Sequence, residues 1–410
     1  MKKLLLVLLI LSLFINHLNA NEKDLQIIQK DKKEYRLLDK ESIQTRQQSQ
    51  KYDWISPIDL SGNIGRNHSF SDENSRNLNN KNTKSASIGF TQSIFESGGI
   101  GFKMDYADNR FKYEMLSWEN QNSQLIYTIY NTLLDIKKLK LEINQNDYRI
   151  VNKDIELIIK KIQYEAGKTD IIELNNAIMS KNLILKEEIA LKNSLKEKEQ
   201  ELAKYTDLKY DEIEILDFQE TNKEIFLDKN YSILEADAKV EMLNSEYKIK
   251  KSQYLPKLSL SAKASYLNKD EKFNSMISDT NKDDATSSGS LILSMPLYDY
   301  TKSSKVQESK IEVLKQKALV NDLKNETAFE YEQIFTKIDT YLKQNETINK
   351  NIKLYEELIG ANKISSEAGM TSKYDLEILE NTKTINEFDI LINKINILQQ
   401  YAKLYFKIKN

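Results

Sequence analysis

The distribution of glycine and proline constrains this chain more than any other feature of its sequence. All three prolines and seven of the ten glycines fall in two windows, about residues 52–101 and 254–299. Both residue types interrupt regular secondary structure. Outside the windows only Gly167, Gly360 and Gly369 break the chain. The chain therefore alternates between long uninterrupted segments and two short segments of a different character.

The long segments predict helices of unusual length. Apolar residues recur at spacings of three and four from about residue 103 to 165 and from about 303 to 367, the pattern of an amphipathic helix. They are Leu125, Ile129, Leu133, Ile136, Leu139 and Ile143 in the first segment, and Ile334, Ile338 and Leu342 in the second. A helix of about 60 residues would be roughly 90 Å long. This length indicates a coiled-coil assembly rather than a globular domain.

Two similar phrases, YEAGKTDIIEL and SEAGMTSKYDL, predict where these helices reverse. In the first, Gly167 follows Ala166, and in the second, Gly369 follows Ala368. A helix that ends and reverses often does so on a residue with positive φ, which glycine adopts without a steric penalty. The segments 171–205 and 374–408 are then expected to run back as helices, so that the chain contains two long helical hairpins.

The start of each returning helix has the spacing of a capping box. An aspartate precedes Glu173 by three residues in the first hairpin, and Ser372 precedes Asp375 by three in the second. In a capping box the first side chain accepts a hydrogen bond from the backbone of the third helical residue. Both starts are therefore expected at these residues.

The two windows predict β-strands, over about residues 57–69, 84–96, 256–268 and 287–298, with Pro57, Pro256 and Pro296 near their ends. Apolar and polar residues alternate in each, which gives one apolar and one polar face. Such strands, joined by long hydrophilic loops, are typical of a transmembrane β-barrel. Four strands cannot close a barrel, and an open sheet edge in lipid is costly. Several copies of the chain must therefore pool their strands.

The order helix, strand pair, long helix, glycine turn and returning helix occurs twice. The first occurrence covers residues 21–205 and the second residues 228–410, with 206–227 as a linker between them. A repeat of this length indicates a duplicated half. Residues 1–20 have two lysines, an apolar run and a small residue at the expected cleavage point, which is typical of a secretory signal peptide.

Composition argues against several classes of function. Basic and acidic residues nearly balance, 60 against 62, so no basic surface for nucleic acid is expected. Beyond the signal peptide, His68 is the only histidine, and the chain has no cysteine. A tetrahedral zinc site and a His-based nucleophilic triad are therefore excluded, although carboxylate chemistry stays formally open. We expect no enzyme, no cofactor and no metal site.

The motifs around the strands and turns resemble those of the TolC-like outer-membrane efflux protein family. The matching features are Leu-Pro-x-Leu-Ser-Leu at 255–260, Met-Pro-Leu-Tyr-Asp at 295–299, the strand exit at 95–99 and the two Ala-Gly turns with an acid six residues on. Their order and spacing cover essentially the whole mature chain.

The resemblance implies a mainly α protein with a small membrane β part. Three chains would form a twelve-stranded β-barrel in the outer membrane, continuous with a barrel of α-helices in the periplasm. A periplasmic adaptor would dock onto the hairpin tips at Ala166, Gly167, Ala368 and Gly369. An inner-membrane transporter would drive substrate into this passive duct, in tripartite efflux or in type I secretion.

The resemblance also implies residues at the periplasmic entrance. Asp375 matches an aspartate that rings the entrance in the family, although it could instead simply complete the capping box. A second family aspartate corresponds to Ile378 here, with Glu377 as a nearby substitute. Glu173 matches an acid that in some members hydrogen-bonds a tyrosine and an arginine. Those positions are Ser366 and Thr371 here, so no charged lock is expected.

Two further expectations stay open at this point. The chain could be a periplasmic adaptor or coiled-coil scaffold without a pore, but adaptors usually have one hairpin and additional β-rich domains. Aromatic residues near the strand ends could form the girdle of a barrel at the membrane interface. They are Trp54, Phe95, Tyr254, Tyr298 and Tyr300.

Overall fold

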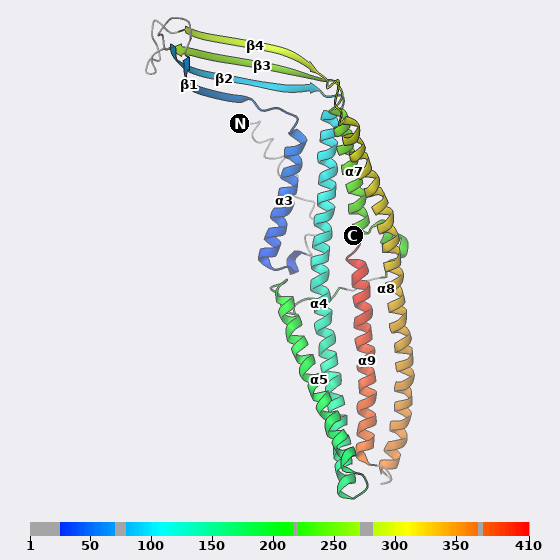
Figure 1. Ribbon diagram of the computed structural model, residues 1–410. Helices are drawn as coiled ribbons and strands as arrows, with labels where there is room; N and C mark the ends of the chain where they lie inside the picture. The colour runs from blue at the N-terminus through cyan, green and yellow to red at the C-terminus, as the bar shows by residue number, and fades with distance from the viewer. Residues whose placement is uncertain are drawn as a thin grey trace, which may run out of the picture. The chain divides into compact units, whose positions relative to one another are not determined.

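The structure is a computed structural model that describes residues 25–69, 79–216, 218, 220–270, 282–367 and 372–409. The expected signal peptide, Ala368 and Gly369 lie outside these residues. The described chain is mainly helical, as the sequence predicts. Its elements in chain order are η1 (Leu25–Ile27), α3 (Lys30–Tyr52), β1 (Asp59–Ser69), β2 (Asn79–Phe95), α4 (Gly99–Glu165), α5 (Ile171–Ala203), α6 (Lys223–Asp228), α7 (Tyr231–Ser252), β3 (Lys257–Asp270), β4 (Lys282–Ser294), α8 (Lys302–Glu367) and α9 (Lys373–Tyr405) (Figure 1).

The chain forms two compact units. The first, which we call the helical unit, comprises residues 1–40, 116–235 and 321–410. The second, the sheet unit, comprises residues 41–115 and 236–320.

In the helical unit, polar contacts define the order in which four helices lie side by side. Asn146 of α4 donates a hydrogen bond to the carbonyl of Ile184 in α5, at 3.3 Å. Gln145 of α4 donates to Asp389 of α9 at 2.7 Å. Asn393 of α9 donates to Asn345 of α8 at 2.9 Å. The order is therefore α5, α4, α9, α8, with α5 and α8 at the two edges (Figure 1).

Apolar side chains between the helices form the core of this unit. The predicted stripe is buried at Ile129, Leu133 and Ile136 in α4 and at Ile334 and Ile338 in α8. The prediction is wrong for Leu342, whose side chain is 50% exposed. From Ile338 the inward-facing stripe of α8 continues at the half-buried positions 341 and 345, so that residue 342 lies one step around the helix.

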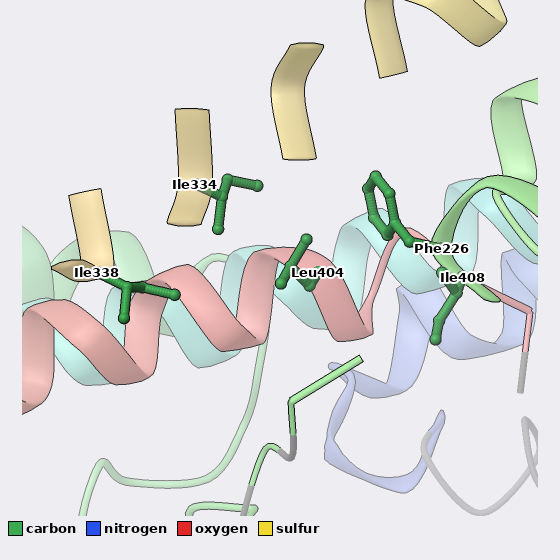
Figure 2. Packing of buried hydrophobic residues seen from close by; sticks show 5 residues of the cluster. All are labelled: Phe226, Ile334, Ile338, Leu404 and Ile408. Carbon is green, nitrogen blue, oxygen red and sulfur yellow. The ribbon is translucent and has the colours of Figure 1, made fainter. Parts of the chain in front are cut away.

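One apolar cluster in this core holds the C-terminal segment against α8. Phe226 of α6 packs with Ile334, Ile338, Leu404 and Ile408, and the five side chains converge in Figure 2. The backbone adds an isolated bridge between Asn230 and Ile408. The amide of Tyr231 donates to Lys407 at 2.9 Å, and the amide of Lys409 donates to Lys229 at 2.8 Å. The segment expected to be a linker therefore contains a short helix with a fully buried phenylalanine.

In the sheet unit, β1, β2, β3 and β4 form an antiparallel sheet in that order, with β1 and β4 at its edges. The observed bounds differ from the expected ones. β2 begins at Asn79, five residues early, because its polar first residues pair with the last residues of β1. β4 ends at Ser294, four residues early, before Pro296. Proline has no N–H to donate to a neighbouring strand.

Candidate functional site

The turn at Gly167 has the geometry that the sequence predicts. Gly167 has φ of 68°. Its amide donates to the carbonyl of Tyr164 at 2.9 Å, and the amide of Lys168 donates to that of Gln163 at 2.8 Å. These two bonds are the Schellman motif, which closes a helix on a residue with positive φ. The next helix, α5, is capped by Asp170, whose carboxylate accepts from the amide of Glu173 at 2.9 Å.

Glu173 is paired within its own hairpin. Lys160 of α4 donates to its carboxylate at 3.0 Å, and both side chains are partly exposed, Lys160 at 36% and Glu173 at 51%. An ion pair of this kind contributes about 0–1 kcal/mol. Sequence reasoning missed this partner, because it looked for one in the second hairpin, at Ser366 and Thr371. Thr371 lies outside the described residues.

The start of α9 is capped, but not by the predicted box. The hydroxyl of Ser372 accepts from the amide of Tyr374 at 3.2 Å, one residue before the position expected. The amide of Asp375 instead donates to the backbone carbonyl of Ser372 at 3.2 Å. The residues Asp375 and Glu377 are both exposed. The serine hydroxyl therefore does not bind the amide of Asp375, and the exposed Asp375 side chain is open to solvent.

Glu173 follows the start of α5, and Asp375 follows the start of α9. Both helices begin at the same end of the helical unit, where α8 ends (Figure 1). Ala166 and Gly167 are at this end as well. The other two predicted tip residues, Ala368 and Gly369, lie outside the described residues. The described part of the tip thus brings together the first glycine turn and the exposed carboxylates of α9.

Above the tip, amide side chains join α4 to α9. Asn152 accepts from Asn381 at 2.9 Å and donates to Thr382 at 3.3 Å. Gln399 donates to Asp135 at 2.7 Å. Gln145 and Asn152 are buried, at 4% and 9% exposure. Buried amides are costly unless they are hydrogen-bonded, so these contacts fix the pairing of the two helices.

Glu330 of α8 forms ion pairs with α9 and with the C-terminal segment that follows it. It accepts from Lys403 at 2.7 Å and from Lys407 at 2.6 Å. Partial burial raises the pKa of its carboxyl, but the hydrogen bonds from Lys403 and Lys407 outweigh this and hold the pKa below its usual value. Glu330 therefore stays charged at neutral pH, and its contact with Lys407 ties the C-terminal segment to α8.

One face of the sheet is lined by hydroxyl groups. Side chains on it pair across the strands: Ser61 with Ser87 at 2.8 Å, Thr91 with Ser261 at 3.1 Å, and Ser265 with Thr286 at 2.8 Å. A concave groove of about 440 Å³ lies on this face, and Asp59 and Lys263 also line it. Hydroxyl groups that hydrogen-bond to one another and to solvent are compatible with a sheet face in contact with water.

The opposite face of the sheet is apolar and exposed. Leu60 lies opposite Ile88 across β1 and β2, and Leu260 lies opposite Leu291 across β3 and β4. Their exposed fractions are 79%, 49%, 39% and 66%. The alternation predicted from the sequence is therefore confirmed. An exposed apolar area of this kind marks contact with lipid or protein.

The predicted aromatic girdle is only partly compatible with the structure. Phe95, Tyr298 and Tyr300 are more than half exposed. The prediction is wrong for Tyr254, because its side chain is only 8% exposed. The ammonium group of Lys302 lies 5.3 Å from the centroid of its ring. Pro57, Pro256 and Pro296 lie immediately outside the strands, where the missing N–H costs no sheet hydrogen bond.

None of the described helices has a stretch long and apolar enough to cross a membrane. In the same part of the chain, His, Cys, Asp and Glu side chains do not gather in groups of three or more that could hold a metal ion.

Comparison with known proteins adds sequence and fold similarity. Residues 224–403 match the family model described as outer membrane efflux protein. No curated protein matches the chain in sequence. The crystal structure of the CmeC outer membrane channel of Campylobacter jejuni aligns with a TM-score of 0.70 at 13% identity, over 92% of this chain and 84% of CmeC.

Two further structures have the same fold. The outer membrane protein VceC of Vibrio cholerae aligns with a TM-score of 0.69 at 14% identity, over 94% of this chain and 93% of VceC. The MtrE outer membrane channel of Neisseria gonorrhoeae, in its open state, aligns with a TM-score of 0.67 at 11% identity, over 94% and 87% of the two chains. At these identities the alignments show a shared fold.

Proposed function

We propose that this chain, a member of the TolC-like outer membrane efflux protein family, is the exit duct of a tripartite efflux or type I secretion system. The family places it in the outer membrane, with its helical part in the periplasm. It would act as a passive conduit, without catalysis, for substrate that an inner-membrane transporter delivers.

The observation that carries the proposal is the sheet with one apolar and one hydroxyl-lined face. Its two edge strands, β1 and β4, each pair on one side within the sheet. A sheet in lipid must have no open edge, and the smallest transmembrane barrels have about eight strands. Three copies would supply twelve strands, with the apolar face toward outer-membrane lipid and the hydroxyl face toward water.

The helical tip would serve two purposes in this duct. The turn at Ala166 and Gly167, with its counterpart at Ala368 and Gly369, would receive a periplasmic adaptor. The exposed Asp375 would repeat around the axis of a homotrimer and attract cations to the entrance, because carboxylates of one sign focus the local potential. Glu377 would add to this field.

Glu173 has a smaller part in the proposed entrance. Its charge is already compensated by Lys160, at 3.0 Å. It would therefore stabilise its own hairpin rather than lock the entrance shut. Whether substrate is a drug, a metal ion, a peptide or a protein would be set by the transporter.

The test is a planar-bilayer recording on the purified mature protein, combined with its mass in detergent. The proposal predicts discrete conductance steps and a particle of three chains. A monomeric particle without conductance would contradict the duct and would favour a scaffold that has no pore.

A further inference from the structure

The apolar face of the sheet is hollowed near its middle. The hollow has a volume of about 450 Å³. The register places Ile88 opposite Ala264 and Ala86 opposite Tyr266, so that small and large side chains alternate across the strands. The hollow therefore lies where alanine methyl groups separate larger apolar side chains. The apolar residues that line it are Leu60, Ala86, Ile88, Ala264, Tyr266 and Ala285.

Two basic residues lie on the same face, nearer the end of the sheet where β1 ends and β2 begins. Lys84 precedes Ala86 by two residues on β2 and lies opposite Ile64 of β1. Arg66 follows Ile64 by two residues on β1, and it is exposed. Alternate residues of a strand share a face, so both basic residues belong to the face of the hollow. Along the strands they are roughly 7–14 Å beyond Ala86.

In the proposed duct, this end of the sheet is the one that lies away from the periplasm. The opposite strand ends adjoin helices: β1 begins shortly after α3 ends, and α4 begins shortly after β2 ends. The helical part lies in the periplasm. The hollow would therefore lie within the hydrocarbon layer, and Arg66 and Lys84 would lie at its outer boundary, level with lipid headgroups.

The two parts of this surface match the two parts of a lipid. A hollow contacts an acyl chain on its sides as well as beneath it, which increases the number of favourable atom contacts over those of a flat face. Basic side chains at the membrane boundary attract anionic headgroups, and arginine binds phosphate through two parallel N–H donors. At the same levels, the register positions of Asp270 and Asp283 belong to β3 and β4, so the basic side is that of β1 and β2.

We propose that this surface binds one outer-membrane phospholipid with an anionic headgroup. An acyl chain lies in the hollow, and Arg66 and Lys84 bind the phosphate. The inference rests on the proposed duct, because it takes the apolar face as the one that faces lipid. A lipid is the occupant because the hollow and the basic pair follow one another along the strands in the order of an acyl chain and its headgroup.

Native mass spectrometry of the full mature protein in detergent tests the headgroup contact. The probes are phosphatidylglycerol and phosphatidylcholine with the same acyl chains, of which only the first is anionic. We expect phosphatidylglycerol to be retained at the lower concentration. Arg66→Gln combined with Lys84→Gln should raise the concentration of phosphatidylglycerol needed for half occupancy by about tenfold to thirtyfold.

The hydroxyl-lined face of the same sheet supplies the matched control. Lys263 lies opposite Gly89, and Lys257 lies opposite Ser294, both on that face. Lys257→Gln combined with Lys263→Gln removes as much positive charge as the first double variant. It should change the half-occupancy concentration by less than about threefold, since surface substitutions away from a site have small effects.

A substitution in the hollow tests the acyl-chain contact separately. Ala264→Phe would fill the hollow with a ring and leave both basic residues in place. It should weaken retention of phosphatidylglycerol by at least about tenfold, because the chain loses the contacts of several methylene groups. Ala264→Ser, which keeps the hollow open, should bind as the native chain does.

Several results would overturn the lipid site. Equal retention of the two phospholipids would do so, as would unchanged retention of phosphatidylglycerol in the Arg66 and Lys84 double variant. A protein partner that covers this face and excludes phosphatidylglycerol would also overturn it. In a protein that still conducts, each of these results leaves the duct intact. A monomer that neither conducts nor retains lipid would overturn both.

Discussion

Phe226 is the residue whose removal should most clearly loosen the C-terminal end of the helical unit. Its side chain is 0% exposed and packs against Leu404 and Ile408, with the ring of Tyr331 at 5.6 Å between centroids. Truncation of a buried phenylalanine to alanine costs about 3–5 kcal/mol, from lost transfer free energy and from the cavity left behind. Phe226→Ala should lower the local stability of this segment by that amount.

Hydrogen exchange measures this loss directly. The amides of Tyr231 and Lys409 are hydrogen-bonded to Lys407 and Lys229, so they exchange when the segment opens. Each 1.4 kcal/mol corresponds to a factor of ten. Their exchange in Phe226→Ala should therefore be faster by roughly a hundredfold to several thousandfold, provided that opening of this segment controls exchange in the native chain.

Ile225 offers the matched control, because it precedes Phe226 in α6 but is 45% exposed. Ile225→Ala should change the exchange of the same amides by less than about threefold, as surface substitutions do. The reasoning is refuted if Phe226→Ala leaves these amides as protected as in the native chain, or if both variants expose them equally.

Three further outcomes are expected. Because the pKa of Glu330 is held low, the Glu330→Gln variant should melt at a lower temperature than the native chain at pH 7. The difference in melting temperature should shrink as pH falls below about 4, because the native carboxylate then becomes protonated. A difference that persists at pH 2 would contradict this. Gly167→Ala should cost about 1–2 kcal/mol in denaturant melts through backbone strain alone, since an added Cβ meets no atom within 4 Å, and no loss would argue against the positive φ. Asp375→Asn should reduce the cation preference of the reversal potential in a salt gradient, whereas Glu173→Gln should not; equal effects would contradict the entrance ring.

The helices could be predicted from the sequence because one simple pattern controls each of them. The glycine at 167 and the apolar periodicity around Ile129 and Leu133 identify a hairpin whatever surrounds it. The bounds of β2 could not be predicted in this way, because Asn79 to Thr83 look like loop residues. They join the strand through backbone hydrogen bonds, which depend on the partner strand rather than on their side chains.

The polar contacts were beyond sequence reasoning for a related reason. Gln145 and Asn152 look like surface residues of an amphipathic helix until the position of α9 is known. The same holds for the Lys160 partner of Glu173, which lies thirteen residues away across a turn.

The central claim is that the sheet has one face toward lipid and the other toward water, and spin labels at alternate residues test it most directly. Labels would be placed singly at Leu260, Ser261, Ser290 and Leu291 of the protein in bilayers, and their collisions with oxygen and with a water-soluble nickel complex would be compared. The account predicts that the two leucine positions are accessible to oxygen and shielded from nickel, and that the two serine positions show the reverse. Equal access to nickel at all four positions would contradict it.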